Sequence, residues 1–203
     1  MKKYKIIYAD PAWSYKDKSK SHGGGAESHY SCMTIEEMCN MPISEIAEKD
    51  SVLFMWVTMP FLQDCFSVIN AWGFTYKTCG FVWIKGNKRM GKQQLSFLPS
   101  DALDDFMGMG RWTRANAEIC LIATKGKISR INPSVRQVIY APIERHSKKP
   151  NETRERIVDL MGDLPRVELF ARQNHEGWDA WGNEIENSLT LGGEGKKIKT
   201  NCV

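Results

Sequence analysis

Short runs of apolar, β-branched and aromatic residues recur along the chain, and polar segments separate them. Runs of about 4–8 residues with this composition are typical of β-strands. They predict strands at residues 5–9, 51–57, 80–84, 118–123, 138–140 and 166–170. Polar and apolar positions do not alternate cleanly inside the runs, which indicates strands that are buried on both faces.

Two segments between these runs carry apolar residues at helical spacing, residues 61–71 and 152–161. Thr34 and Glu37 resemble a capping box that opens a further short helix, and Pro150 suits a helix start. Strands that alternate with helices predict an α/β fold. We expect a mostly parallel, twisted sheet with helices on both of its faces.

The polar segments and the chain length suggest how the protein is organised. An apolar content of 42% in 203 residues is enough for one substantial core. We therefore expect a single catalytic domain over residues 1–188 and a disordered tail over residues 189–203, which is rich in glycine and lysine. Residues 16–28 and 86–110 read as long polar loops, and loops of this length are often functional.

Composition excludes several classes of protein. No run of about 18 apolar residues is present, and the first residues lead straight into a strand-like run, so we expect a cytoplasmic protein of a bacterial or phage-infected cell rather than a membrane protein. The six cysteines and four histidines show no Cys-x-x-Cys or His-x-x-x-His spacing. The sequence therefore predicts neither a metal site nor a disulfide framework.

The charge of the chain is compatible with a polyanionic partner but does not require one. The net charge is +4 and the pI is near 8.7. Several basic and aromatic residues crowd one central stretch, for which a solvated loop is by itself the favoured interpretation. They are Lys85, Lys88, Arg89, Lys92, Arg111 and Arg114, with Trp83, Phe97, Phe106 and Trp112 among them.

The tetrapeptide Asp10-Pro11-Ala12-Trp13 directly follows the first predicted strand. The carboxyl ends of parallel strands are where α/β sheets bind ligands. An ordinary turn is the alternative, with Asp10 capping the backbone and Trp13 packed in the core. Only the rest of the sequence can separate these two interpretations.

The tetrapeptide has the groups needed to make an exocyclic amine nucleophilic. The nitrogen lone pair of such an amine is delocalised into its ring, and two hydrogen-bond acceptors would localise it. The Asp10 carboxylate and the Pro11 carbonyl could each accept one amine hydrogen, and the fixed φ of proline would keep that carbonyl oriented. The Trp13 ring could stack on an extruded base, which is worth roughly 1–3 kcal/mol.

Further blocks follow the tetrapeptide in a fixed order. They lie at residues 30–38, 53–57, 72–74, 110–118, 146–150, 168–172 and 177–184. With these blocks the chain resembles the MT-A70 family of adenine methyltransferases, above all its small bacterial and phage-encoded members. The resemblance covers nearly everything from residue 5 to residue 186. It departs at Ala12, where many relatives have a second proline, but the carboxylate, the proline carbonyl and the indole remain, so we expect activity to survive.

The resemblance implies a Rossmann-like methyltransferase sheet with a permuted motif order and S-adenosylmethionine as the methyl donor. It also implies a set of cofactor contacts whose charges suit that zwitterionic ligand. These are Asp10, Lys149, Glu168, Arg172, Asn174, Asn183 and Glu184. Without the resemblance, the favoured interpretations would be an ion pair between Glu168 and Arg172 at a strand edge and a solvated helix entry at Lys148 and Lys149. The chain has no Gly-x-Gly-x-x-Gly loop, which counts against a nicotinamide enzyme.

The resemblance also implies residues that face the target base. They are Tyr15, His29, Tyr30, Arg111, Arg114, Asn116 and Glu118. Arginine can bind phosphate or stack on bases, and asparagine can pair with a base edge. An exposed turn before a strand, with Glu118 bonded locally, is an equally good interpretation of the last four.

Together these observations predict a site-specific methyltransferase that acts on the N6 amine of adenine in DNA. Methylation of adenine in RNA or of cytosine N4 in DNA uses the same device and stays open. A non-catalytic nucleic-acid-binding subunit is a third hypothesis. Asp10 and Trp13 argue against it, since such subunits of the family have this motif altered. A homodimer or a partner subunit is also left open.

Overall fold

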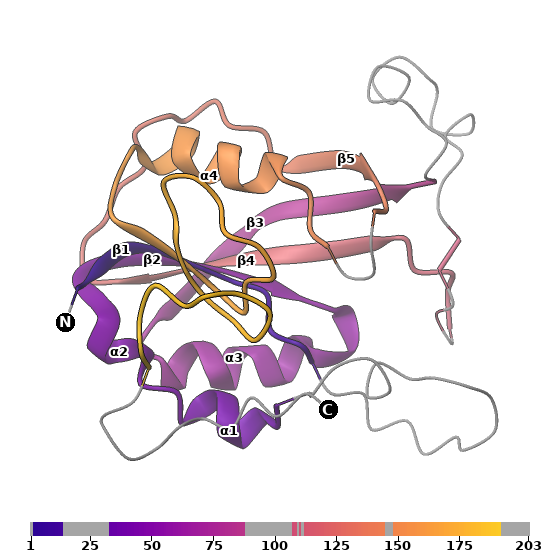
Figure 1. Ribbon diagram of the computed structural model, residues 1–203. Coiled ribbons are helices and arrows are strands. Elements are labelled where there is room, and N and C mark those ends of the chain that lie inside the picture. The colour runs from indigo at the N-terminus through magenta and orange to yellow at the C-terminus, as the bar shows by residue number, and fades with distance from the viewer. Residues whose placement is uncertain are drawn as a thin grey trace. The chain divides into compact units, whose positions relative to one another are not determined.

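The computed structural model describes residues 2–13, 33–87, 107–108, 110, 112–144 and 148–191 (Figure 1). Seven strands occur within these ranges and are hydrogen-bonded in the order β5-β3-β4-β2-β1-β6-β7. Their bounds are β1 (Tyr4–Ala9), β2 (Ala47–Val57), β3 (Thr75–Gly86), β4 (Ala117–Lys125), β5 (Val138–Pro142), β6 (Arg166–Leu169) and β7 (Asp179–Trp181). The six predicted strands are confirmed, and β7 is an addition that the sequence did not predict.

The described ranges contain few helices. They are α1 (Ile35–Cys39), α2 (Ile43–Ile46), the 3-10 helix η2 (Met59–Phe61), α3 (Leu62–Ala71) and α4 (Glu152–Met161). The two long predicted helices and the capping box of α1 are confirmed, whereas α2 and η2 were not predicted. No helix within the described ranges is both long and apolar enough to cross a membrane.

Most neighbouring strands run parallel, but β4 does not. Strand β1 pairs in parallel with β2 and β6, as do β6 with β7 and β3 with β5. The Lys127 amide, just after β4, donates to Asp50 near the start of β2. The end of β4 therefore lies beside the start of its neighbour β2, and these two strands are antiparallel. The sheet is mixed.

The described chain forms two compact units. The first comprises Met1–Thr78, Leu121–Ser129 and Leu164–Val203, and the second comprises Cys79–Cys120 and Arg130–Asp163. Strands β3 and β4 each continue from one unit into the other. The expectation of a single domain over residues 1–188 stays a prediction. Of the predicted tail, residues 192–203 lie outside the described residues, whereas Leu191 is buried.

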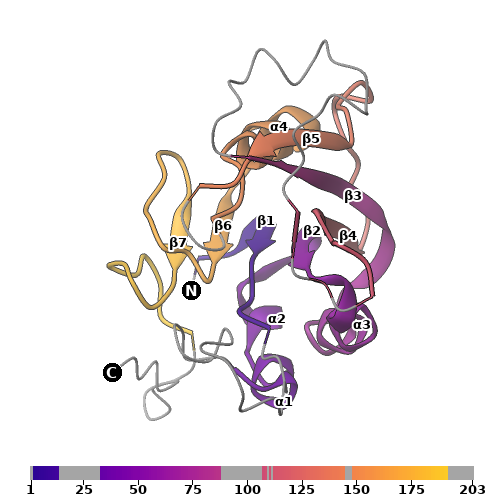
Figure 2. The same cartoon turned by 90° about the vertical axis from the view of Figure 1, so that its right-hand side faces the viewer.

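The core of the first unit forms around β1, which lies between β2 and β6 (Figure 2). Ile6, Ile7 and Tyr8 are fully buried, as expected of a strand covered on both faces. The Trp72 indole, at the end of α3, donates to the Met38 carbonyl of α1 over 2.7 Å. This bond adds a polar link to the packing of α3 against α1.

The expectation of burial on both faces is wrong for β5 in the second unit. Val138 is 37% exposed and Tyr140 is 45% exposed. Strand β5 is the last in the hydrogen-bonded order, so it has a neighbouring strand on one side only. An apolar run in the sequence does not distinguish such an edge strand from a central one.

Candidate active site

The tetrapeptide Asp10-Pro11-Ala12-Trp13 lies at the carboxyl edge of four parallel strands in the first unit. Strands β2, β1, β6 and β7 run in one direction, so their carboxyl ends share one edge (Figure 2). In register, Ala9 lies between Met55 of β2 and Leu169 of β6. The Asp10 amide donates to the Leu169 carbonyl over 3.5 Å. Asp10 is therefore the first residue beyond the edge at which such sheets bind ligands.

A tight turn holds the Pro11 carbonyl. The Trp13 amide donates to this carbonyl oxygen over 3.0 Å, which closes a three-residue turn. A carbonyl oxygen has two lone pairs, so Pro11 can accept one further hydrogen bond. Beyond the turn, Trp13 forms a parallel β-bridge with Met33. The turn thus orients the carbonyl that the sequence assigned to the target amine.

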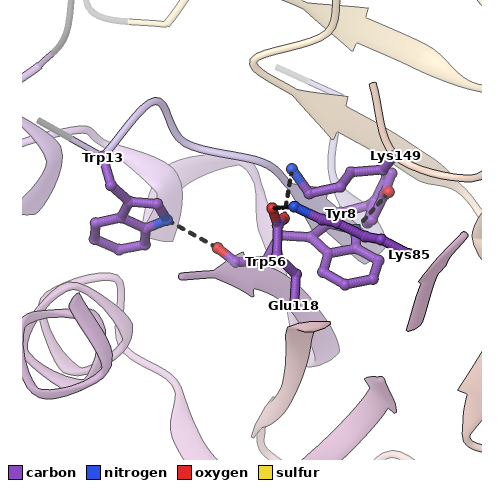
Figure 3. A network of polar contacts seen from close by, with 6 residues as sticks. All are labelled: Tyr8, Trp13, Trp56, Lys85, Glu118 and Lys149. Atoms are coloured by element: carbon purple, nitrogen blue, oxygen red, sulfur yellow. Dashed lines mark hydrogen bonds and ion pairs between the residues drawn. The ribbon is translucent and has the colours of Figure 1, made fainter. Parts of the chain in front are cut away.

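Trp13 is buried, with 6% of its surface exposed. Its indole N–H donates to the Trp56 carbonyl over 3.0 Å, and the Trp56 indole donates to the Tyr8 hydroxyl over 2.7 Å (Figure 3). The Trp13 ring also stacks on Phe61, with the ring centroids 5.9 Å apart and an angle of 19° between the planes. These contacts fix the orientation of the ring. Stacking of a target base on the Trp13 ring stays a prediction.

Five of the predicted cofactor residues follow or belong to β6 and β7, at the same edge as Asp10. Glu168 is buried in β6, where it pairs in register with Tyr8 of β1. Arg172 is half-buried, while Asn174, Asn183 and Glu184 are exposed. The segments that carry them touch, because the Ala171 amide donates to the Trp181 carbonyl and a Cβ on Gly182 would collide with the Ala171 carbonyl.

In the second unit, the Glu118 carboxylate lies between two lysines. The Lys85 ammonium is 2.5 Å from one carboxylate oxygen, and the Lys149 ammonium is 3.2 Å from the other (Figure 3). Burial alone would raise the pKa of Glu118, but the charges of Lys149 and Lys85 outweigh it and lower the pKa below its ordinary value. Glu118 is thus an anion with two cationic partners.

This cluster joins residues to which the sequence assigned different roles. Lys149 was predicted to contact the cofactor and Glu118 to face the target, and the structure brings them together. Lys85 was not among the predicted site residues. Its amide donates to the Asn116 carbonyl over 2.8 Å, which places the end of β3 beside the start of β4. Two signals were available in the sequence: Lys85 directly follows the predicted strand at residues 80–84, and it belongs to the central basic stretch.

Of the remaining residues predicted to face the target base, two are described by the structure and four are not. Arg114 is exposed and Asn116 is half-buried. Tyr15, His29, Tyr30 and Arg111 lie outside the described residues. Among the described residues, no three histidine, cysteine, aspartate or glutamate side chains gather in a way that could hold a metal ion.

Comparison with known proteins identifies the family. The family model described as MT-A70 matches residues 4–184. The chain belongs to the MT-A70 family. Membership in MT-A70 implies the methyltransferase fold for the mixed sheet, so the resemblance noted in the sequence is confirmed.

Relatives in this family differ in how much of their length the chain covers. The chain is 34% identical to the type II methyltransferase M.MunI from Mycoplasma sp, over 96% of this chain and 84% of that protein. It is 26% identical to the N(6)-adenosine-methyltransferase catalytic subunit METTL3 from Homo sapiens, over 91% of this chain and 28% of that protein. A similar protein from Arabidopsis thaliana, named N(6)-adenosine-methyltransferase MT-A70-like, is also 26% identical, and the chain covers 25% of it.

Proposed function

We propose that this MT-A70 protein is an S-adenosylmethionine-dependent methyltransferase that methylates the N6 amine of adenine at specific sites in cytoplasmic DNA. One observation carries the proposal. The tetrapeptide Asp10-Pro11-Ala12-Trp13 follows β1 at the carboxyl edge of four parallel strands, in a chain that belongs to the MT-A70 family. The similarity to a type II methyltransferase over 84% of that protein's length favours DNA as the substrate.

Asp10 and Pro11 prepare the amine for the reaction. The Asp10 carboxylate accepts a hydrogen bond from one amine N–H, and the second lone pair of the Pro11 carbonyl oxygen accepts a hydrogen bond from the other. Both bonds draw the nitrogen towards a pyramidal geometry with a localised lone pair. Since the turn at Trp13 already holds the Pro11 carbonyl, little reorganisation is needed when the amine binds.

The polar residues after β6 and β7 fit the methyl donor. S-adenosylmethionine, when bound, supplies a sulfonium methyl group and presents an ammonium, a carboxylate and ribose hydroxyls. Carboxylates of Glu168 and Glu184 can accept from the ammonium or the hydroxyls, and the Arg172 guanidinium can hold the carboxylate. We assign further contacts to Asn174 and Asn183 from the same two segments. The contact assigned to Lys149, which belongs to the second unit, rests on the family resemblance alone. For the fold, we also propose helices on both faces of the sheet and a permuted order of the methyltransferase motifs.

Methylation of adenosine in RNA is the second candidate function. It is favoured by the relatives named N(6)-adenosine-methyltransferase, which are 26% identical to this chain. Those proteins are much longer, since the chain covers only about a quarter of each. The shorter, type II methyltransferase is the better match in both identity and length, so we favour DNA.

Transfer of labelled methyl groups tests the proposal. The protein is incubated with labelled S-adenosylmethionine and matched pools of DNA and RNA, and the products are digested to nucleosides. We expect N6-methyladenine in DNA. Methyl groups in RNA alone would move the substrate to RNA, and methylcytosine would change the target base.

Two variants separate chemistry from binding. Asp10→Asn keeps the size of the side chain but replaces one carboxylate oxygen by an amide, and we expect at least a 100-fold loss of kcat, as is typical when one preorganised polar group is removed. Binding of S-adenosylhomocysteine, measured by calorimetry, reports separately on the cofactor pocket. Asp64→Asn, in the first turn of α3, is the matched control and should leave kcat unchanged. Full activity in Asp10→Asn would contradict the mechanism.

A further inference from the structure

Trp112 differs from every other tryptophan of the chain in its exposure. It is 96% exposed, whereas the other six are at most 9% exposed. Tryptophan is a large, mostly apolar side chain that proteins usually bury, and it is enriched at surfaces that bind other molecules. Packing in the core therefore does not explain the presence of Trp112, in contrast to its six counterparts.

The backbone is closely packed on either side of this indole. The Ala115 amide donates to the Thr113 carbonyl over 2.9 Å. A Cβ on Gly108 would collide with the Ala115 carbonyl, and a Cβ on Gly110 would collide with the Thr113 carbonyl. Glycine is required at both positions because the backbone approaches so closely. Close backbone packing thus surrounds Trp112 in the chain, while its ring remains in solvent.

The charge of this segment suits a polyanion. Arg114 is exposed two residues after Trp112, and residues 107–117 include no aspartate or glutamate. A guanidinium can pair with a phosphate, and an indole can cover the flat face of a base. Together they match the two chemically different parts of a nucleic-acid strand.

We propose that Trp112 stacks on a base of the bound DNA while Arg114 pairs with a backbone phosphate. The inference rests on the proposed function, since it requires DNA as the partner. Every base has a π-face, so this contact supplies affinity without reading sequence. It is separate from the binding of the target adenine at Asp10 and Pro11.

Acrylamide quenching of tryptophan fluorescence tests the contact directly, because acrylamide reaches exposed indoles and Trp112 is the one tryptophan of the seven that is largely exposed. The full chain should show one readily quenched component, and Trp112→Phe should lack it. A single-stranded deoxyoligonucleotide of mixed sequence, at saturation, should protect this component. A component that stays quenchable in the saturated complex overturns the proposal.

Affinity and its salt dependence separate the two side chains. Trp112→Ala should weaken binding of the same oligonucleotide roughly 5- to 150-fold at every salt concentration, with the salt slope unchanged. Arg114→Ala should instead reduce the salt slope by about 0.7. Trp112→Phe keeps an aromatic face and should retain most of the affinity. The matched control is Tyr140→Ala, which removes another exposed aromatic ring of the same unit and should change nothing.

Three results would overturn the proposal. Equal losses in Trp112→Ala and Tyr140→Ala would show a non-specific effect. Protection of Trp112 by raised protein concentration without DNA would identify a second copy of the chain as the occupant. A salt slope that falls in Trp112→Ala would show an indirect effect on charge contacts.

Methyl transfer by the same wild-type preparation separates failure of this inference from failure of the proposed function. Transfer to DNA without protection of Trp112 leaves the function standing and removes the stacking contact. Protection without transfer to any nucleic acid leaves the DNA contact standing and overturns the proposed methylation.

Discussion

At the scale of single residues, Glu118 shows how a buried charge is compensated. Its side chain is 15% exposed, and those of Lys85 and Lys149 are 18% and 8% exposed. An uncompensated charge at this depth would be costly, and the carboxylate offsets the repulsion between the two ammonium groups. Loss of the Glu118 carboxylate therefore also affects the environment of Lys85 and Lys149.

We expect Glu118→Gln to lower the free energy of unfolding by on the order of 3 kcal/mol at neutral pH, because two buried cations lose their anion. The pKa of Glu118 is lowered in the folded protein. Its contribution is therefore complete above the ordinary carboxyl pKa of about 4.3 and is lost as the pH falls through the folded pKa. Urea unfolding at neutral and acid pH measures this, and the difference from wild type should shrink in acid.

Glu144→Gln is the control for this experiment. Glu144 pairs with Lys148 in the same unit, but its side chain is 53% exposed. Exposed pairs of this kind contribute about 0–1 kcal/mol. Equal destabilisation by the two variants, or a loss in Glu118→Gln that does not depend on pH, would contradict the account of the cluster.

Thr58, which directly follows β2, has a buried hydroxyl oxygen with no hydrogen-bond partner among the described residues. Its backbone carbonyl accepts from the Phe61 amide over 2.9 Å, so the turn into η2 does not depend on the hydroxyl. A buried polar atom without a partner costs about 1–3 kcal/mol.

Thr58→Val replaces the hydroxyl by a methyl group of similar size. We expect the free energy of unfolding to stay the same or rise by about 1 kcal/mol, since the unpaired oxygen is removed. Thr58→Ala should lower it by about 1 kcal/mol, because it leaves a small cavity. Thermal unfolding of both variants measures the difference. A Thr58→Val variant that is clearly less stable than wild type would contradict the absence of a hydrogen-bond partner for this hydroxyl.

At the scale of elements, α1 is a short helix whose ends are both fixed by specific contacts. The Glu37 amide donates to the Thr34 hydroxyl, and the Glu37 carboxylate accepts from the Thr34 amide over 2.7 Å. Near the other end, the Met38 carbonyl accepts from Trp72. A helix of five residues is too short to be stable by itself, so these contacts decide whether it forms.

We expect Thr34→Ala to lower the free energy of unfolding by about 1 kcal/mol, the usual contribution of an N-cap side chain. Thr34→Ser keeps the oxygen and should be within a few tenths of wild type. Chemical denaturation measures both. Equal stability of wild type and Thr34→Ala would mean that contacts such as Trp72 to Met38 suffice to form α1.

At the scale of the whole molecule, two compact units share the continuous strands β3 and β4. Each unit contains part of both strands, so a unit that unfolds disorders strands on which the other unit also depends, and we expect one cooperative unfolding transition. Two buried cysteines report on it, Cys65 in the first unit and Cys120 in the second. Burial raises the pKa of Cys65 to about 12, so its thiol is unreactive in the folded protein.

Labelling with a thiol reagent at increasing urea concentration, followed by peptide mapping, tests this coupling. Cys65 and Cys120 should become reactive at the same urea concentration, because one transition exposes both. Cys39, which is only half-buried, should react earlier and marks the folded baseline. Labelling of Cys120 well before Cys65 would show that the second unit unfolds independently.

The sequence alone determined the features that depend on neighbours along the chain. Apolar runs located six strands, helical spacing located α3 and α4, and Thr34 with Glu37 marked the start of α1. The motif order identified the family, and the position of Asp10 directly after a strand anticipated the carboxyl edge. The three-residue β7 escaped prediction because so short a segment has no recognisable period.

Only the tertiary structure decided which distant residues meet. The pairing direction of β4, the stacking of Trp13 on Phe61 and the meeting of Lys85, Glu118 and Lys149 each join segments far apart in the chain. Local conformational preferences along the chain cannot predict such pairs. They are selected when the whole sheet forms, because burial of apolar surface and completion of backbone hydrogen bonds choose among many locally equivalent arrangements.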